Sequence, residues 1–387
     1  MTDADDSVRY AASCDGGATP LAADAPGAAT DDPGLASVNV AGHLDAPFPY
    51  FGGKAYAAAR VWEILGDVES YVEPFFGSGA VLLGRPLDHQ KRWELVNDLD
   101  GFISNFWRAV QSDPDAVAHH CDWPINERDL YARHLWLVSA GRERLATMAA
   151  DPAAFCPEVA GLWCWGVSQW VGSGWCAASA PDDHVADRRP HVGPRRGVRK
   201  SSVSAGMPDV YNGHHRGVMR VANSRPHVTH AQGITNADGP GDLIAWFRRL
   251  QNRLRRVLVL NGDWRRAVGS PSVLGLNSVT GPVGVFLDPP YDTTVRATKI
   301  YAHDVPGVAA DVRAWCLENG GNKRLRIVLA GYDNEGHDEP LVAAGWRAIA
   351  SPARHPGMGA RSGNKNNLRE TLWASPACLA QRQETLL

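Results

Sequence analysis

The hydrophobic positions of this chain fall into short runs, and the pattern within these runs predicts β-strands. The clearest run, Val283–Leu287, is apolar with almost no alternation, and it ends abruptly at an acid followed by two prolines. Such a run is typical of a strand buried on both faces of a parallel sheet. Proline cannot continue a central strand, so the chain must leave the sheet at Asp288. Six further runs predict strands, at residues 70–73, 92–96, 257–260, 326–330, 346–350 and 370–374.

Apolar residues at helical spacing lie between several of these strands and predict helices. Strands that alternate with helices are typical of an α/β fold built on a parallel sheet. The last two predicted strands, with a polar stretch between them, indicate an antiparallel hairpin that closes the sheet. One predicted helix ends near Leu65, and four others span residues 101–111, 130–138, 243–256 and 308–318.

Two stretches have an unusual composition that a structural role explains. Four tryptophans lie between Trp163 and Trp175, and aromatic residues at helical spacing are expected to belong to the core. The stretch 243–256 carries five arginines, which we expect on a solvated helix face: Arg248, Arg249, Arg253, Arg255 and Arg256.

Length and composition set the class of protein. The chain has 387 residues, 44% of them hydrophobic, which is enough for one large domain or two moderate ones. No apolar run approaches the roughly 18 residues of a membrane span, and the N-terminus lacks the pattern of a secretion signal. The seven cysteines form no CxxC pair and no Cys/His metal spacing. We therefore expect a cytoplasmic protein with reduced thiols and no metal.

Charge is divided unevenly along the chain. Residues 1–45 contain eight aspartates against one arginine, and their Ala-, Gly- and Pro-rich composition predicts an acidic disordered tail. Without this tail, the formal charge of −3 becomes about +4 for residues 46–387. A mildly basic folded part is compatible with a nucleic-acid partner.

The end of the strand 283–287 offers a candidate site. In open α/β sheets, ligands bind just beyond the carboxyl ends of the strands. The Asp288 carboxylate and a backbone carbonyl there can accept hydrogen bonds from a planar amino group, and Tyr291 supplies a face for stacking. These groups indicate a pocket for the exocyclic amine of a nucleobase. The alternative is a proline-rich turn in which Tyr291 merely packs.

A second candidate site follows the strand 70–73. Gly77 and Gly79 permit a tight turn before an apolar helix, as in the nucleotide-binding half of Rossmann-like folds. The turn is neither a dinucleotide GxGxxG nor a phosphate-binding loop. About 20 residues on, Asp98 stands where an acid holds a ribose hydroxyl, although either Asp98 or Asp100 could instead cap the next helix. We expect Asp98 to be the ligand and Asp100 the cap. Asp263, at another strand end, is a candidate for an adenine amino group.

Three motifs in order resemble one known family. They are Phe51-Gly52-Gly53-Lys54, then Glu73-Pro74-Phe75-Phe76-Gly77-Ser78-Gly79, then Asp288-Pro289-Pro290-Tyr291. This order resembles the Dam-like (D12 class) DNA adenine-N6 methyltransferases, in particular phage-type members. The resemblance covers roughly 45–111, 155–176 and 257–376, and several motifs in one order are more specific than any motif alone.

The resemblance implies a Rossmann-like, seven-stranded sheet that binds S-adenosyl-L-methionine and methylates N6 of a flipped-out adenine in double-stranded DNA. We also expect a monomer, in the cytoplasm of a bacterial or phage-infected cell. The implied catalytic residues are Asp288, Pro289, Pro290 and Tyr291. The implied cofactor-binding residues are Tyr50, Gly53, Lys54, Glu73, Phe75, Phe76, Gly77, Gly79, Asp98 and Asp263.

The resemblance also implies a division of the chain. After the tail, residues 46–111 would form the cofactor-binding half, 112–240 an inserted target-recognition region, and 241–387 the catalytic half. A segment over the pocket, 293–301, is expected to be mobile. Whether the enzyme belongs to a restriction–modification pair is left open.

Residues 186–234 stand apart from the family pattern. Between Arg188 and His230 there are nine Lys or Arg and one acid, and a Pro-x-Val motif recurs at intervals of 18 residues. Either the segment lies along a DNA phosphate backbone, or it is a disordered basic insertion. If it becomes ordered only on DNA, both descriptions are correct. The candidate nucleic-acid contacts are Arg188, Arg189, Arg195, Arg196, Arg199, Lys200, Arg216 and Arg220.

Two rival functions stay open. The acceptor could be cytosine N4 or a base in RNA, although Asp before Pro-Pro-Tyr favours adenine by family resemblance. Alternatively, the chain could be a catalytically silent DNA-binding protein on the same fold.

Overall fold

The computed structural model describes residues 44–48, 50, 54–86, 93–124, 127–149, 151, 154–170, 175–176, 240–290, 307–332, 335–350 and 370–378. The chain divides into two units, 1–42 and 43–387, and all of these residues lie in the second unit. Residues 1–43 of the acidic tail, the basic repeats and the segment 293–301 lie outside the described residues, so the predictions made for them stay predictions.

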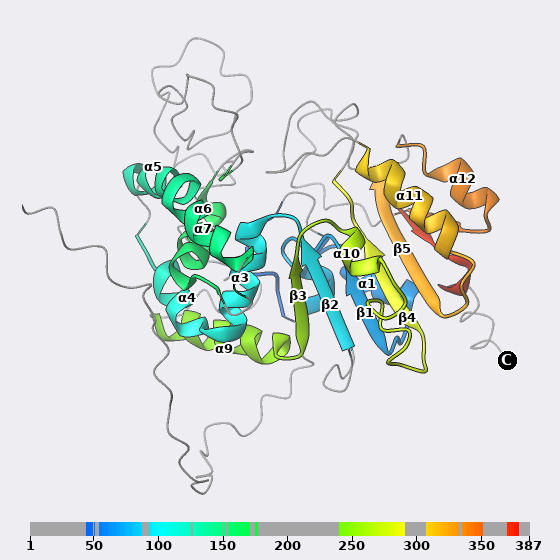
Figure 1. Ribbon diagram of the computed structural model, residues 1–387, viewed down its shortest axis with the longest axis horizontal. Coiled ribbons are helices and arrows are strands. Elements are labelled where there is room, and N and C mark those ends of the chain that lie inside the picture. Colours follow the sequence, from blue (N-terminus) through cyan, green and yellow to red (C-terminus); the bar gives the residue numbers. More distant parts are fainter. Residues whose placement is uncertain are drawn as a thin grey trace, which may run out of the picture. The chain divides into compact units, whose positions relative to one another are not determined.

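A seven-stranded sheet forms the centre of this unit, as the sequence predicts (Figure 1). Its strand order is β3-β2-β1-β4-β5-β7-β6. The first five strands in this order are parallel, whereas β7 is antiparallel to both β5 and β6. The predicted closing hairpin is therefore confirmed. The strands are β1 (Ser70–Glu73), β2 (Trp93–Asp98), β3 (Val257–Asn261), β4 (Val283–Leu287), β5 (Leu325–Tyr332), β6 (Arg347–Ala350) and β7 (Glu370–Ala374).

The two central strands are buried on both faces, which explains their continuous apolar sequences. Every residue of β1 and β4 is buried. In β4, Phe286 packs into the apolar cluster on one face, while Val285 and Leu287 pack into the cluster on the other. Their register, with Val72 opposite Val285, brings the carboxyl ends of β1 and β4 to the same edge of the sheet.

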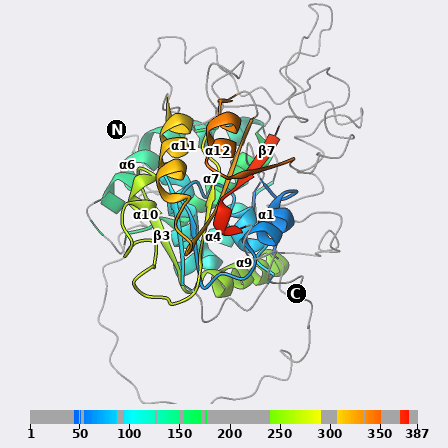
Figure 2. The ribbon, with the colours of Figure 1, turned by 90° about the vertical axis from the view of Figure 1, so that its right-hand side faces the viewer.

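Helices cover both faces of the sheet. Apolar residues of α1, α2 and α3 belong to the first cluster, and those of α10, α11 and α12 belong to the second. Figure 2 shows α1 on the opposite side of the sheet from α10 and α11. The helices are α1 (Ala58–Leu65), α2 (Ala80–Leu83), α3 (Gly101–Ser112), α10 (Arg265–Val268), α11 (Val308–Asn319) and α12 (Asp338–Ala343).

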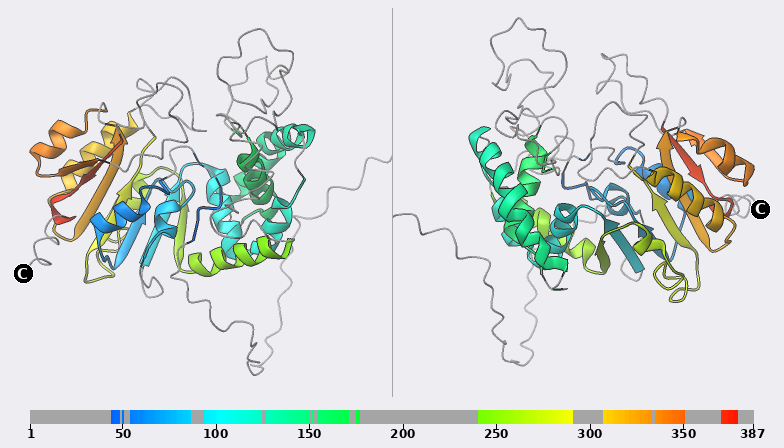
Figure 3. Two further views of the ribbon diagram at one scale, coloured as in Figure 1. Left: turned by 180° about the vertical axis from the view of Figure 1, so that it is seen from behind. Right: turned by 45° about the horizontal axis from the view of Figure 1, so that its top comes forward.

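A group of further helices packs beside the sheet at the β3 end (Figure 3). Helix α4 packs against α7 and α9, and α3 contacts the same two helices. The aromatic core predicted here is present, since Trp163, Trp165 and Trp175 are buried. These helices are α4 (Pro114–Cys121), α5 (Glu127–Trp136), a π-helical turn (Leu137–Gly141), α6 (Arg142–Ala146), α7 (Pro157–Gln169) and α9 (Pro240–Leu254). In the described part of the chain, no helix has the length and apolar character needed to cross a membrane.

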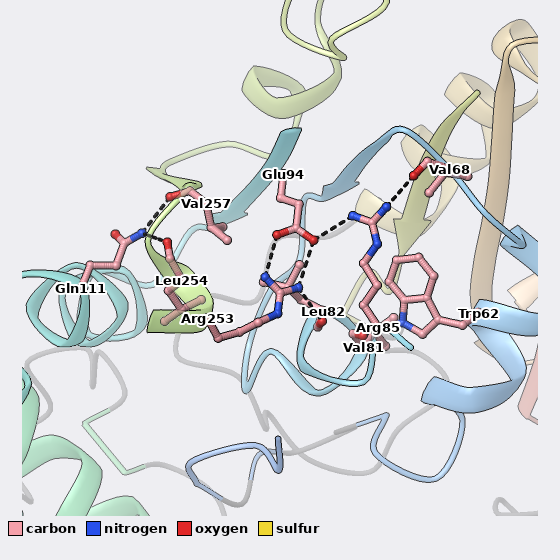
Figure 4. A network of polar contacts seen from close by, with 10 residues as sticks. All are labelled: Trp62, Val68, Val81, Leu82, Arg85, Glu94, Gln111, Arg253, Leu254 and Val257. Atoms are coloured by element: carbon pink, nitrogen blue, oxygen red, sulfur yellow. Dashed lines mark hydrogen bonds and ion pairs between the residues drawn. The ribbon is translucent and has the colours of Figure 1, made fainter. Parts of the chain in front are cut away.

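One expectation for α9 is wrong. Arg248 and Arg249 are exposed, as a solvated face requires, but Arg253 is buried (Figure 4). Its guanidinium bonds Glu94 of β2 at 2.7 and 2.9 Å, and Arg85 bonds the same carboxylate at 2.8 Å. Glu94 is itself buried within the sheet, so it needs cationic partners, and α9 supplies one of them.

Candidate active site

One cavity opens at the carboxyl edge of the parallel strands. It measures about 1070 Å³, including open solvent at its mouth, and residues that follow β1, β2, β3 and β4 all line it. Along the chain, β1, β2 and β3 extend the sheet in one direction, and β4 and β5 extend it in the other. The cavity therefore lies where the strand order reverses, which is the usual ligand site of open α/β sheets.

The turn after β1 depends on glycine. Gly77 and Gly79 have φ angles of 50° and 69°, which residues other than glycine rarely adopt. A Cβ on Gly77 would lie 2.8 Å from Cδ1 of Tyr50. Both glycines therefore keep the turn narrow, and Gly77 lines the cavity.

Asp98 ends β2 and bonds this turn. Its Oδ2 accepts a hydrogen bond from the Gly77 N–H at 2.8 Å, and its Oδ1 accepts one from the Asp100 N–H at 2.9 Å. Burial, with the nearby charge of Asp100, raises the pKa of Asp98 to about 7. Asp100 instead accepts from the Phe102 N–H at 2.8 Å and caps α3, as the sequence predicts. Asp98 is thus placed at the cavity wall beside the glycine turn.

Asp263 follows β3 and lies at the mouth of the cavity. It accepts from the Arg265 N–H at 2.9 Å, and the Arg265 guanidinium lies 3.3 Å from its Oδ2. The same guanidinium pairs with Asp311 of α11 at 2.7 Å. Nearby, the rings of Phe75 and Trp264 are stacked, with centroids 5.9 Å apart. Acidic and aromatic groups therefore share this end of the cavity.

Asp288 follows β4 and forms an ion pair inside the cavity. Its Oδ2 lies 2.8 Å from the Lys54 Nζ, and the same ammonium lies 2.9 Å from Oε1 of Glu370. The Lys54 side chain is only 3% exposed. Tyr56 donates a hydrogen bond to the other oxygen of Glu370. Lys54, which the sequence assigns to cofactor binding, therefore forms an ion pair with Asp288, the candidate catalytic acid.

Glu73 is the other acid close to Asp288. It is buried and accepts a hydrogen bond from the Tyr71 hydroxyl at 2.9 Å. Burial raises the pKa of Glu73 well above its usual range, the negative charge of Asp288 adds to this rise, and the Tyr71 hydrogen bond opposes it. Glu73 therefore holds its proton more strongly than an ordinary glutamate does, and Asp288 is the acid that forms the ion pair with Lys54.

The structure brings together most of the catalytic and cofactor-binding residues proposed from the sequence. Ten line the cavity: Tyr50, Lys54, Glu73, Phe75, Phe76, Gly77, Asp98, Asp263, Asp288 and Pro290. Gly79 and Pro289 are described but do not line it. Gly53, Tyr291 and all eight basic candidates lie outside the described residues: Arg188, Arg189, Arg195, Arg196, Arg199, Lys200, Arg216 and Arg220.

Several contributors were not predicted from the sequence. Arg265 and Asp311 line the cavity, and Glu370 holds Lys54. Arg265 could have been found from its place two residues after Asp263, whereas Asp311 and Glu370 reach the site only through the fold. Among the described residues, no group of three or more His, Cys, Asp or Glu side chains is arranged to hold a metal ion.

The seven-stranded sheet is that of a Rossmann-like methyltransferase fold, and a glycine turn and strand-end acids line the cavity at its edge. A sequence model of one family, described as D12 class N6 adenine-specific DNA methyltransferase, matches residues 50–135. This match confirms the family resemblance indicated by the motifs. It includes the glycine turn and Asp98 but ends before Asp288. No curated protein matches the sequence. The phage-type subdivision stays a prediction.

Proposed function

We propose that this protein is a site-specific DNA methyltransferase that transfers a methyl group from S-adenosyl-L-methionine to N6 of adenine. The family match supports methylation of adenine in DNA. The observation that carries the proposal is that one cavity joins the glycine turn and Asp98 to Asp288. A methyl donor and an acceptor amine must meet in such a shared space for direct transfer.

The described residues fit the donor at several points. Gly77 and Tyr50 both line the cavity, and any side chain at position 77 would meet Tyr50. Glycine at this position therefore leaves room in the cavity for the amino-acid end of S-adenosyl-L-methionine. The Asp98 carboxylate is placed to accept hydrogen bonds from a ribose diol. Phe75 and Trp264 offer apolar surface to a flat base, and Asp263 offers an acceptor to its amino group. When bound, the donor supplies an electrophilic methyl group on a sulfonium.

Asp288 and its neighbour supply the acceptor side of the reaction. The lone pair of adenine N6 is delocalised into the ring, so this amine is a poor nucleophile. In this proposal N6–H donates hydrogen bonds to the Asp288 carboxylate and to the carbonyl of Pro289, which lies between the cavity residues Asp288 and Pro290. These bonds draw the nitrogen toward tetrahedral geometry and direct its lone pair toward the methyl group. Positive charge then develops on N6, and the Asp288 carboxylate stabilises it in a partly buried site. The resulting cation loses its proton readily, and Asp288 can receive it.

A base inside a duplex cannot reach this cavity. It must be flipped out of the stack, at a cost of a few kcal/mol. In this proposal Tyr291 stacks on the flipped base and recovers roughly 1–3 kcal/mol. Residues 112–240 serve as the target-recognition region, within which the basic repeats supply affinity for the phosphate backbone rather than sequence choice. We further propose double-stranded DNA as the substrate, a monomeric enzyme and a cytoplasmic location.

The decisive test is the modification state of DNA made in the presence of the protein. The full chain and its Asp288→Ala variant are expressed to equal levels in a host that lacks DNA methylation, and plasmid DNA is sequenced with detection of modified bases. We expect N6-methyladenine within one recurring sequence, and none with the variant. Methylation of cytosine N4 would overturn the proposed acceptor. An unmodified plasmid, together with no methyl transfer to DNA or RNA by the purified protein, would indicate a silent DNA-binding protein.

A further inference from the structure

The ion pair between Lys54 and Asp288 is held from a third element of the fold. Lys54 precedes α1, Asp288 follows β4, and Glu370 begins β7. In the sheet, β5 lies between β4 and β7, and Glu370 stands opposite Tyr332 at the carboxyl end of β5. Because β7 is antiparallel to β5, its first residue lies at the same sheet edge as the last residues of β4. The fold therefore brings Glu370 to the cavity edge from far along the chain.

Both oxygens of Glu370 have partners that fix its position. Its Oε1 lies 2.9 Å from Lys54 Nζ, and its Oε2 accepts from the Tyr56 hydroxyl. The Glu370 side chain is only 11% exposed and that of Lys54 only 3%, so solvent screens this pair weakly. Lysine has a flexible four-carbon stem, and a buried ammonium needs anionic partners to stay charged and in one place. Glu370 is the partner that does not belong to the strand-end motif.

The contact with Lys54 restricts the rotation of the Asp288 carboxylate. The terminal torsion of an aspartate is broad, so an aspartate held at no oxygen samples a wide range of orientations. An ammonium 2.8 Å from Oδ2 selects one of these orientations and so fixes the direction of the second oxygen. Transfer to N6 needs the acceptor amine within a narrow angular range, so a poorly oriented carboxylate lowers the rate of the chemical step.

We propose that Glu370 is a positioning residue for methyl transfer, which acts by holding the Lys54 ammonium against Asp288. This proposal rests on the proposed function and adds a role for β7 to it. The charges of the three groups support the same role. Glu370 offsets the positive charge of the Lys54 ammonium, so that Asp288 keeps its negative charge for the positive charge that develops on N6.

The test compares Glu370→Gln with a matched control, Glu63→Gln. Glu63 lies on α1, and its side chain is 62% exposed and pairs with Arg60 on the same helix. We expect Glu370→Gln to lower the single-turnover rate of DNA methylation by at least about tenfold, while the Kd for S-adenosyl-L-methionine stays within about twofold. The control should leave both unchanged. An unchanged rate in Glu370→Gln would overturn this proposal. It would leave the proposed function intact, because methyl transfer would still take place.

A double-mutant comparison separates positioning from a general structural role. In a Lys54→Met background the ammonium is absent, so we expect Glu370→Gln to cause no further loss of rate. If it lowers the rate by the same factor as in the wild type, Glu370 does not act through Lys54 and the proposal is wrong. Should Glu370→Gln unfold, Tyr56→Phe provides a milder variant that removes one hydroxyl bonded to Glu370. It should lower the rate by about two- to fivefold with unchanged Kd, and an unchanged rate would contradict the proposal.

Discussion

The Arg253 guanidinium lies 2.7 Å from Oε2 of Glu94, although 159 residues separate the two along the chain. The contact joins α9 to β2, and it is completed by a hydrogen bond from Arg253 to the Leu82 carbonyl at 3.0 Å. Helix α9 is the first described element after the insertion that carries the basic repeats. This buried pair therefore fastens the returning chain to the sheet.

Replacement of Arg253 should destabilise the fold. We expect Arg253→Met to lower the free energy of unfolding by about 3–5 kcal/mol, because Glu94 keeps its burial but loses one of its two cationic partners. The exposed Arg249 on the same helix is the matched control, and Arg249→Met should change the value by less than about 0.5 kcal/mol. Urea unfolding followed by circular dichroism measures both. Equal unfolding midpoints for the two variants would contradict the role of the pair.

Asp98 should make cofactor binding depend on pH. With a pKa of about 7, its carboxylate is mostly protonated at pH 6 and mostly ionised at pH 8. The ionised form is the better acceptor for a ribose diol, so the affinity of the wild type for S-adenosyl-L-methionine should rise about tenfold over this range. Asp98→Asn removes the titrating group and should show a smaller rise in calorimetric titrations. The amino group of the cofactor titrates in the same way with the wild type and with Asp98→Asn. The difference between the two pH dependences of affinity therefore reports the titration of Asp98.

The same pKa fixes the sign of an effect on stability. An unfolded aspartate titrates near 3.9, so from about pH 4 to pH 7 the folded protein holds a proton on Asp98 that the unfolded chain has lost. The contribution of Asp98 to the free energy of unfolding is therefore full below about pH 4 and is lost as the pH rises through about 7. Relative to Asp98→Asn, the wild type should become less stable between pH 5 and pH 8. Parallel urea midpoints for the two proteins would refute this.

Removal of the Asp98 side chain should weaken cofactor binding directly. A hydrogen bond to a charged group contributes roughly 1.5–3 kcal/mol, so Asp98→Ala should weaken the affinity for S-adenosyl-L-methionine by about that amount. Calorimetric titration of the folded variant provides the measurement. If its affinity equals that of the wild type, Asp98 only braces the Gly77 turn.

Replacement of Asp288 should abolish the chemical step while affecting cofactor binding only weakly. We expect Asp288→Ala to abolish methyl transfer while the Kd for the cofactor changes by less than about tenfold, or ~1.4 kcal/mol. The reason is that Asp288 lies at the β4 end of the cavity, whereas Asp98 and Asp263 lie at the ends of β2 and β3. Radiolabelled transfer and calorimetry provide the two readouts. Substantial activity in the variant would exclude the proposed acceptor role.

The basic repeats should contribute affinity rather than sequence choice. Phosphate contacts position a protein on DNA but specify no base, and each neutralised phosphate adds about −0.9 to the slope of log affinity against log salt. Deletion of residues 186–231 should flatten this slope and weaken binding to every sequence alike. The methylated sites should stay the same at saturating enzyme. A changed set of methylated adenines with an unchanged salt slope would show that the segment reads bases.

The sheet and the strand-end acids could be predicted because their signals are local. An apolar run that stops at an acid places that acid at the sheet edge, and this reasoning gave Asp98, Asp263 and Asp288 their positions along the cavity. The pairing of Lys54 with Asp288 and Glu370 could not be predicted in this way. It depends on β7 running antiparallel beside β5, and no spacing in the sequence specifies that neighbour.

The burial of Arg253 was missed for a related reason. A helix with several arginines is normally solvated, and nothing in its own sequence separates Arg253 from Arg249. The signal lay elsewhere, in Glu94, an acid that directly precedes the apolar Leu95 and Val96 inside a strand. A buried acid requires a cation, but only the packing of α9 determines which arginine supplies it.

The pairing of β1 with β4 has a consequence for synthesis of the chain. Ser70 stands opposite Val283, about 210 residues later, so at about 5–20 residues per second β4 is made roughly 10–40 s after β1. During that interval β1 already has its neighbour β2 but presents an unpaired strand edge on its other side. Helices α3, α4 and α7, which pack on one another and lie earlier in the chain, can associate meanwhile. The nascent protein therefore exposes the cavity residues that follow β1 and β2 at the edge of an incomplete sheet until β4 brings Asp288.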